Sequence, residues 1–108
     1  MSEIKIQSQA YSWFHNNYPE LRGLLCYNLN NSRNKIDGNQ NKALGLQKGR
    51  SDMAFYYNGR AYFFEFKTET GMQSMDQKLW ETLVKAHGFT YIIIRSFEQF
   101  QTEIEKIL

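Results

Sequence analysis

The stretch from Asp52 to Thr68, DMAFYYNGRAYFFEFKT, decides the fold of this chain. At its centre is Asn58-Gly59, a dipeptide that strongly favours a two-residue type I′ turn between antiparallel strands. Aromatic and apolar residues, which favour strands, precede and follow the turn. We therefore predict a hairpin with strands over 52–57 and 60–68. Counting back from the turn in this register places Asp52 directly opposite Glu65.

Two carboxylates therefore face each other at the open end of the hairpin. Directly opposed side chains have Cβ atoms about 4.5–5.5 Å apart, and like charges there are destabilising. Because side chains alternate along a strand, Lys67 lies on the same face as Glu65. A divalent cation would relieve the repulsion, and Mg²⁺ prefers one or two carboxylates together with waters and phosphate oxygens. The alternative is a solvated strand end at which Lys67 neutralises one acid.

Helices and further strands surround the hairpin. Apolar residues recur at helical spacing over Glu3–Asn17, Ser74–His87 and Phe97–Leu108. Leu21–Leu29 and Tyr91–Arg95 are short apolar runs that predict buried strands. This order predicts an α/β fold in a single domain over 1–108, with an α-β-β-β-α-β core, a mixed central sheet flanked by helices, and a C-terminal helix. The expected core-facing stripe of the helix over 74–87 is Leu79, Trp80, Leu83, Val84 and His87.

A basic segment connects the first predicted strand to the hairpin. Between residues 33 and 50 there are five basic residues and one acid, among many asparagines and glycines. This composition predicts a long, solvated, cationic loop. One interpretation is a flexible surface loop, and the other is a loop that closes on a phosphate backbone. In the second interpretation the nucleic-acid contacts are Arg33, Lys35, Lys42, Lys48 and Arg50.

Composition excludes several classes of protein. The chain has 108 residues, of which 42% are hydrophobic, with one cysteine and two histidines. These counts exclude an internal disulfide framework and a standard Cys/His zinc site within one chain. No apolar run approaches the roughly 18 residues of a membrane span, and the N-terminus lacks the pattern of a signal peptide. We expect a cytoplasmic protein with no membrane partner.

The spacing of the charged residues resembles a nuclease signature. KGRSD followed by FEFK is similar to the D…(D/E)-x-K pattern of the PD-(D/E)xK nuclease superfamily. The wider pattern, GLQKGRSD, EFK, GMQSMDQ, a helix ending in HG and then YIIIRSFEQF, resembles the VRR-NUC family over about residues 45–100. The core of that superfamily is restriction-endonuclease-like and has the element order predicted above. Ser51 stands where the motif usually has proline.

The resemblance implies catalytic roles for four residues. Asp52 and Glu65 match the metal-binding carboxylates, Lys67 matches the lysine of the motif, and Gln77 matches the glutamine of the following helix. Lys67 would orient the attacking water or stabilise charge in the transition state. Gln77 has an alternative interpretation, because Ser74-x-x-Gln77 is also a helix capping box.

The resemblance also implies a cofactor and an activity. The cofactor is Mg²⁺ or Mn²⁺, held by Asp52, Glu65 and the Phe66 backbone carbonyl, with Glu3 where the family often has an acid on the first helix. The activity is hydrolysis of phosphodiester bonds in DNA by a homodimeric endonuclease from a bacterium or phage, with branched or junction DNA as candidate substrates. One alternative is a nucleic-acid-binding module with a degenerate site, and another is an interaction protein. Retention of Asp52, Glu65 and Lys67 favours the enzyme.

Overall fold

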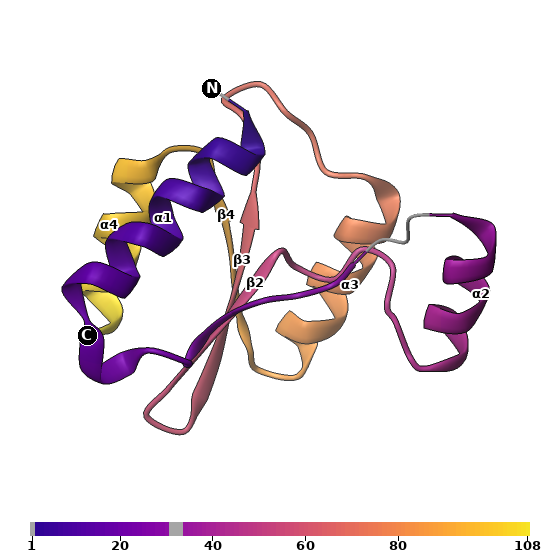
Figure 1. Cartoon of the computed structure of the whole chain (residues 1–108), viewed down its shortest axis with the longest axis horizontal. Helices are drawn as coiled ribbons and strands as arrows, with labels where there is room; N and C mark the ends of the chain where they lie inside the picture. The colour runs from indigo at the N-terminus through magenta and orange to yellow at the C-terminus, as the bar shows by residue number, and fades with distance from the viewer. Residues whose placement is uncertain (1, 31–33) are drawn as a thin grey trace.

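The hairpin centred on Asn58-Gly59 forms as predicted. Both turn residues have positive φ, 53° at Asn58 and 78° at Gly59, as a type I′ turn requires, and Tyr57 pairs with Arg60. The computed structural model describes residues 2–30 and 34–108. Figure 1 shows its elements: α1 (Glu3–Asn17), the 3₁₀ turn η1 (Pro19–Leu21), β1 (Leu25–Tyr27), α2 (Lys35–Ala43), β2 (Met53–Tyr57), β3 (Arg60–Phe66), α3 (Met75–Ala86), β4 (Thr90–Ile94) and α4 (Phe97–Ile107).

The strands form one mixed sheet in the order β1-β2-β3-β4. β1 and β2 are antiparallel, as are β2 and β3, whereas β4 runs parallel to β3 with Tyr91 opposite Phe63. α3 is the crossover that the parallel pair requires. The predicted α/β fold with a mixed central sheet flanked by helices is therefore confirmed, with the C-terminal helix in place.

Helices cover both faces of this sheet (Figure 1). α1 and α4 pack on one face, over a core that includes Phe55, Phe64 and Phe66. α3 packs on the other face, where Phe63 and Tyr91 belong to a smaller core. Alternation along β3 sends Glu65 to the same side as Phe63, toward α3. None of the helices in the described ranges combines the length and the apolar character needed to cross a membrane.

The prediction of a loop over 33–50 is wrong for α2. Asn34 caps this helix by accepting a 2.8 Å hydrogen bond from the Asp37 N–H, and Gly45, with φ 97°, follows its C-terminal end. The asparagines and glycines that indicated a loop thus include the residues that begin and end a helix. No residue of α2 is buried, and the helix projects from the body beyond α3 (Figure 1).

Two other predictions need correction. The first strand, predicted over Leu21–Leu29, is only three residues long, Leu25–Tyr27. Its predicted first residue, Leu21, is instead the last residue of the 3₁₀ turn Pro19–Leu21. On α3, Trp80 and Val84 contact the core as predicted, but Leu79 and Leu83 are 60% and 56% exposed. Successive helical residues point about 100° apart, so the two pairs cannot share one buried stripe on a helix that packs on a single sheet. His87, the C-cap residue, is also exposed.

Candidate active site

Asp52 lies just before β2, where the regular pairing of the hairpin ends. The last paired residues are Met53 and Phe64. Beyond this pair, a side-chain hydrogen bond replaces the backbone hydrogen bonds between the strands. Asp52 Oδ2 accepts a 2.7 Å hydrogen bond from the Phe66 backbone N–H. This bond holds the Asp52 carboxylate on the side of the hairpin where Glu65 lies, so that both acids line one cavity. The hairpin thus brings the two acids together although its ladder stops one pair short of them.

Glu65 is buried on β3, with 1% of its surface exposed. Its Oε2 accepts a 2.8 Å hydrogen bond from Gln77 Nε2 and lies 3.8 Å from Lys67 Nζ. Its Oε1 accepts a 3.3 Å hydrogen bond from the Tyr91 hydroxyl. Burial raises the pKa of Glu65 to about 8, Asp52 adds to the rise, and Lys67 opposes it. Burial and the Asp52 charge together outweigh Lys67 and favour the protonated form of Glu65 at neutral pH.

Gln77 fulfils both interpretations of its sequence position at once. In the capping box of α3, its Oε1 accepts a 2.8 Å hydrogen bond from the Ser74 N–H, and the Ser74 hydroxyl accepts one from the Gln77 N–H. Its Nε2 remains free to donate to Glu65. The capping box fixes the rotamer that points the amide at the carboxylate. Helix capping and positioning of Glu65 are therefore the work of one side chain.

Tyr91 is a site residue that the sequence analysis did not identify. Its buried hydroxyl donates to Glu65 and accepts a 3.4 Å hydrogen bond from Gln73 Nε2, which also donates to Glu81 at 3.0 Å. Burial raises the pKa of Tyr91 above that of an ordinary tyrosine, and the charge of Glu65 raises it further. The hydroxyl thus stays a donor to Glu65. The run Tyr91–Ile94 gives no sign of which side chain faces α3, because all its members suit a buried strand.

Two asparagines after β1 fix the segment that leads to Asp52, through hydrogen bonds to residues 50–52. Asn30 Nδ2 donates to Asp52 Oδ1 at 3.2 Å and to the Arg50 carbonyl at 2.9 Å. Asn28 Nδ2 donates to the carbonyl of Ser51 at 3.2 Å. Ser51 itself is fully buried, and its hydroxyl donates to the Met53 carbonyl at 3.0 Å. Hydrogen bonds from the serine and its asparagine neighbour thus fix the backbone at the position where the related motif usually has proline.

The Lys48-Gly49 pair lies against the first turn of α3. Gly49 has φ 82°, and a Cβ atom there would overlap the Asp76 carbonyl and approach the Gln77 nitrogen. Only glycine allows this close approach. The contact places Lys48 in the wall of the cavity that opens on the carboxylates.

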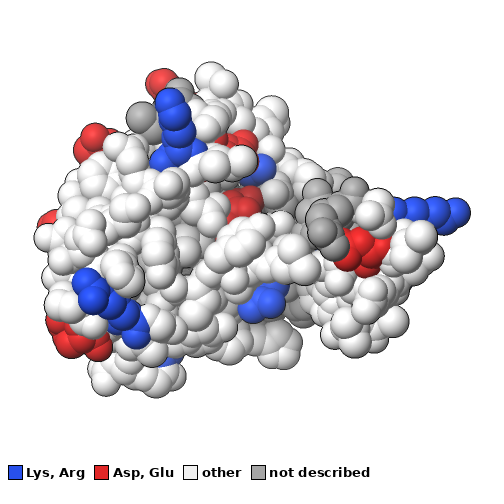
Figure 2. Space-filling view, viewed as in Figure 1, with Lys and Arg blue, Asp and Glu red and all other residues white. Residues whose placement is uncertain are grey.

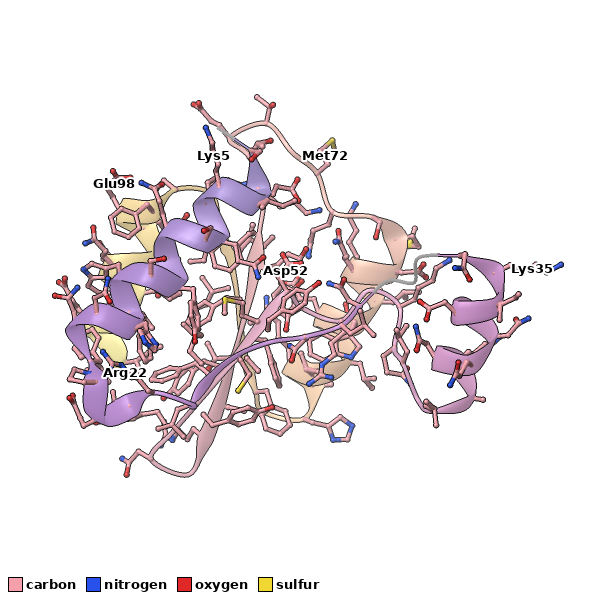
Figure 3. All side chains as sticks on the ribbon, viewed as in Figure 1. Lys5, Arg22, Lys35, Asp52, Met72 and Glu98 are labelled. Atoms are coloured by element: carbon pink, nitrogen blue, oxygen red, sulfur yellow. The ribbon has the colours of Figure 1, made fainter. Side chains whose placement is uncertain are left out.

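That cavity has a volume of about 330 Å³. The hairpin, α1, α3 and the segments that precede β2 all contribute to its walls. Figure 3 shows Asp52 at the centre of the molecule, between α1 and α3. Glu3, on the first turn of α1, also lines the cavity. The lining residues are Glu3, Asn30, Lys48, Gly49, Asp52, Glu65, Ser74, Asp76 and Gln77.

The donor set of this cavity suits a hard divalent cation. Four of its lining residues carry carboxylates and one is a lysine, so the lining has an excess of negative charge. Burial and the neighbouring Asp52 raise the pKa of Glu65, and a cation beside the two carboxylates would lower it. Within 2–30 and 34–108, no group of three or more His, Cys, Asp or Glu side chains gathers closely enough to hold a metal. Two carboxylates are nevertheless a common protein contribution to a Mg²⁺ site, in which waters and phosphate oxygens complete the coordination.

The predicted nucleic-acid-binding residues are not gathered at one place. Lys48 lines the cavity, and Arg50 lies two residues from Asp52 and is half-buried. Lys35 and Lys42 are exposed on α2, and Lys35 points away from the body at the outer end of that helix (Figure 3). Arg33 lies outside the described residues. On the face shown in Figure 2, lysines and arginines are scattered and acidic atoms are exposed near the centre.

The structure is similar to one solved protein described as a "VRR_NUC domain protein", with a TM-score of 0.82. The match covers 98% of this chain and 87% of that chain, at 13% sequence identity. No family model matches the sequence, and no curated protein matches it. At such low identity the likeness is one of fold. The chain therefore has the VRR-NUC-like, restriction-endonuclease-like fold that the motif resemblance implied.

Proposed function

We propose that this protein is a metal-dependent nuclease that hydrolyses phosphodiester bonds in DNA. The observation that carries the proposal is the placement of the Asp52 and Glu65 carboxylates in the wall of one cavity, with Lys67 and Gln77 beside Glu65. A pair formed by the buried Glu65 and the half-buried Asp52 is costly for a structural role, because burial and like charge both disfavour ionisation. The arrangement supports a site that receives a cation and a phosphate. The VRR-NUC-like fold agrees with this chemistry.

Each site residue has a role in the proposed reaction. Asp52 and Glu65 would hold Mg²⁺ or Mn²⁺, with the Phe66 carbonyl as a further ligand. Glu3 lines the same cavity but does not gather with the two acids into a group of three, so its proposed part is to bind a water of the ion. A bound metal ion of this kind lowers the pKa of a coordinated water and polarises the phosphate. Lys67 supplies a fixed positive charge beside Glu65, where it can offset the charge that develops on the phosphate oxygens.

Gln77 orients the Glu65 carboxylate, and Lys48 assists the approach of a phosphate to the site. The amide nitrogen of Gln77 donates to Glu65 Oε2, and this hydrogen bond keeps the Glu65 carboxylate in the same orientation whether or not a cation is bound. Lys48 is the cation on the cavity wall. It offsets the repulsion between an incoming phosphate and the carboxylates. Branched or junction DNA is the substrate structure that we propose, because a domain of 108 residues has little surface for reading a duplex by sequence.

We also propose that the protein acts as a homodimer. The support is the outward face of α3, where Met75, Leu79 and Leu83 recur every fourth residue and are 69%, 60% and 56% exposed. An apolar stripe of this kind is typical of an interaction surface. Two sites related by a two-fold axis could cut both strands of a junction.

A plasmid assay tests the proposed activity. Supercoiled plasmid and a four-way junction are incubated with the protein in Mg²⁺, Mn²⁺ or EDTA, and we expect cleavage in either metal and none in EDTA. Lys67→Ala should abolish cleavage, while binding of the junction weakens only slightly, because one cation among many contributes little affinity. Binding without cleavage by the wild type in both metals would identify a nucleic-acid-binding module instead. Cleavage by Lys67→Ala at the wild-type rate would show that Lys67 is structural.

A further inference from the structure

The cavity at the carboxylates continues into a larger groove with no role in the proposed reaction. The groove runs between α1 and β1, has a volume of about 670 Å³, and shares Glu3, Asn30 and Asp52 with the cavity. In Figure 2 this face is hollowed beside α1. A nucleic-acid strand with a phosphate at Asp52 would therefore have its neighbouring nucleotide at the mouth of the groove.

Two exposed aromatic rings line the groove. Tyr27, on the edge strand β1, is 67% exposed, and Tyr11, on α1, is 41% exposed. Tyr11 stacks on His15 with a distance of 5.7 Å between ring centroids, which restrains the orientation of its ring. Exposed aromatic rings beside a nucleic-acid path are platforms on which unpaired bases stack, whatever the base.

The charge of the groove is wrong for a sugar-phosphate backbone. Among the described residues that line it there is no lysine or arginine, and its only charged groups are Glu3 and Asp52 at the cavity end. Leu25, Gln7 and Ser8 complete an apolar and neutral polar wall. Backbone phosphates bind where cations gather. A flat, uncharged group with hydrogen-bonding edges fits this wall better.

We infer that the groove binds an unpaired nucleobase next to the scissile phosphate, stacked on Tyr27 and Tyr11. The inference rests on the proposed nuclease function, because the scissile phosphate defines which base reaches the groove. Bases within a duplex are stacked on both faces, so a tyrosine ring can reach only an unpaired or extruded base. The groove would thus select DNA with a single-stranded branch beside the cut.

A binding experiment with matched tyrosine variants tests this inference. The probe is a duplex with a single-stranded branch that carries 2-aminopurine, compared with a fully paired duplex of the same sequence, both in Ca²⁺. Tyr27→Leu should weaken binding of the branched probe by about 5- to 150-fold, the range expected for one base stacked on an aromatic ring. Binding of the paired duplex should not change, and Tyr27→Phe should restore the wild-type affinity. Tyr56→Leu is the control, because Tyr56 is a 42% exposed tyrosine outside the groove.

The second aromatic ring of the groove provides an independent measurement. Tyr11 lines the groove from α1, so Tyr11→Leu should also weaken binding of the branched probe and leave binding of the paired duplex unchanged. Stacking on the tyrosine rings should quench the fluorescence of 2-aminopurine in the branch, and Tyr27→Leu should reduce this quenching at a saturating protein concentration. Far-ultraviolet circular dichroism and thermal melting of each variant show that the fold is kept, as expected for an exposed side chain.

Three results would overturn the inference. The first is equal binding of the branched probe by Tyr27→Leu and Tyr56→Leu, and the second is unchanged 2-aminopurine fluorescence in the saturated complex. The third is equal affinity of the wild-type protein for the branched probe and for the paired duplex, which would show that the groove does not select an unpaired base. If the protein cleaves DNA in the plasmid assay and one of these results appears, only the groove assignment fails. If the protein neither binds nor cleaves any probe, the proposed nuclease function fails with it.

Discussion

Glu65 determines how the candidate site responds to protons and to cations. Three side chains stabilise its carboxylate, namely Gln77, Tyr91 and Lys67. Burial and the neighbouring Asp52 nevertheless outweigh them and raise the pKa of Glu65 to about 8. A metal ion and a proton would compete for the same oxygens, because a ligating carboxylate must be deprotonated. Metal affinity should therefore increase as the pH rises toward and through about 8.

Replacing Glu65 by glutamine should stabilise the metal-free protein more at high pH than at low pH. The pKa of Glu65 is higher in the folded state than its ordinary 4.5, so the stability that its protonation contributes is complete below 4.5 and is lost as the pH rises through about 8. Glutamine stays uncharged throughout. Urea midpoints of both proteins between about pH 5 and 9, in EDTA, should show a difference that grows with pH. A difference independent of pH would contradict the raised pKa.

Replacing Asp52 by asparagine should remove stabilisation by metal. Mn²⁺ or Mg²⁺ at 100 times its Kd should stabilise the wild type by about 2.7 kcal/mol, seen as a rise in Tm. In Asp52→Asn the amide oxygen can still accept the Phe66 N–H, but the amide nitrogen then meets the donor Nδ2 of Asn30. Loss of the charge repulsion with Glu65 offsets this unfavourable contact, so the metal-free variant should be close to the wild type in stability. An equal metal-induced rise in both proteins would show that the ion binds elsewhere.

The residues of the site were predictable where local rules apply. Asp52, Glu65 and Lys67 follow from one turn and the alternation of one strand, because both are properties of consecutive residues. Tyr91 and Asn30 reach the same carboxylates from β4 and from the segment after β1. Their contacts depend on how separate elements pack, and neither residue lies in a repeating pattern. Local sequence therefore predicts the acids and the lysine, while tertiary structure supplies the groups that orient them.

At the scale of elements, the hairpin and α2 show opposite uses of asparagine and glycine. In Asn58-Gly59 both residues take positive φ, which joins two strands. In the segment before the hairpin, Asn34 and Gly45 instead lie at the two ends of a helix. Composition alone does not separate these roles, because it ignores spacing. The spacing between a capping asparagine and a terminal glycine was the signal for α2 that the composition obscured.

The division of the basic residues between α2 and the cavity leads to a prediction about salt. Lys48 lines the cavity, whereas Lys35 points outward from the far end of α2 (Figure 3). Each phosphate contact on duplex DNA contributes about −0.9 to the slope of log affinity against log salt concentration. Lys48→Ala should make this slope shallower by about 0.9, and Lys35→Ala, with the same change in charge, should leave it unchanged.

Fluorescence anisotropy of a labelled duplex in a salt titration measures both slopes. The two variants should also keep the metal-induced rise in Tm, since neither lysine is a proposed ligand. Equal slopes for Lys48→Ala and the wild type would show that the DNA does not cross the cavity at Lys48. A shallower slope for Lys35→Ala would instead place DNA along α2.

At the scale of the whole molecule, the parallel pairing of β3 with β4 assembles the site. It sets Tyr91 opposite Phe63, two residues before Glu65 and on the same face of the sheet, and the crossover through α3 brings Gln77 to the same carboxylate. Strand order and crossover involve residues far apart in the chain. The element order predicted a mixed sheet, but periodicity could not show which strands would be neighbours. The tertiary fold thus supplies the hydrogen bonds from Gln77 and Tyr91 that hold the Glu65 carboxylate beside Asp52.

The same topology leaves one apolar surface without a partner within the described chain, and it makes the homodimer testable. α3 buries Trp80 and Val84 against the sheet, so Leu79 and Leu83 face outward. Sedimentation velocity should show a dimer that Leu79→Glu converts to a monomer, because a buried charge in an apolar interface is costly. Thr82→Glu is the control, with the same added charge at an exposed position one residue from Leu83.

No described residue of α3 lines the groove between α1 and β1, so dimerisation through α3 would leave that groove open to DNA. A wild-type monomer at tens of micromolar would rule out the homodimer, and dissociation by both variants alike would show that the charge acts without a specific contact at Leu79.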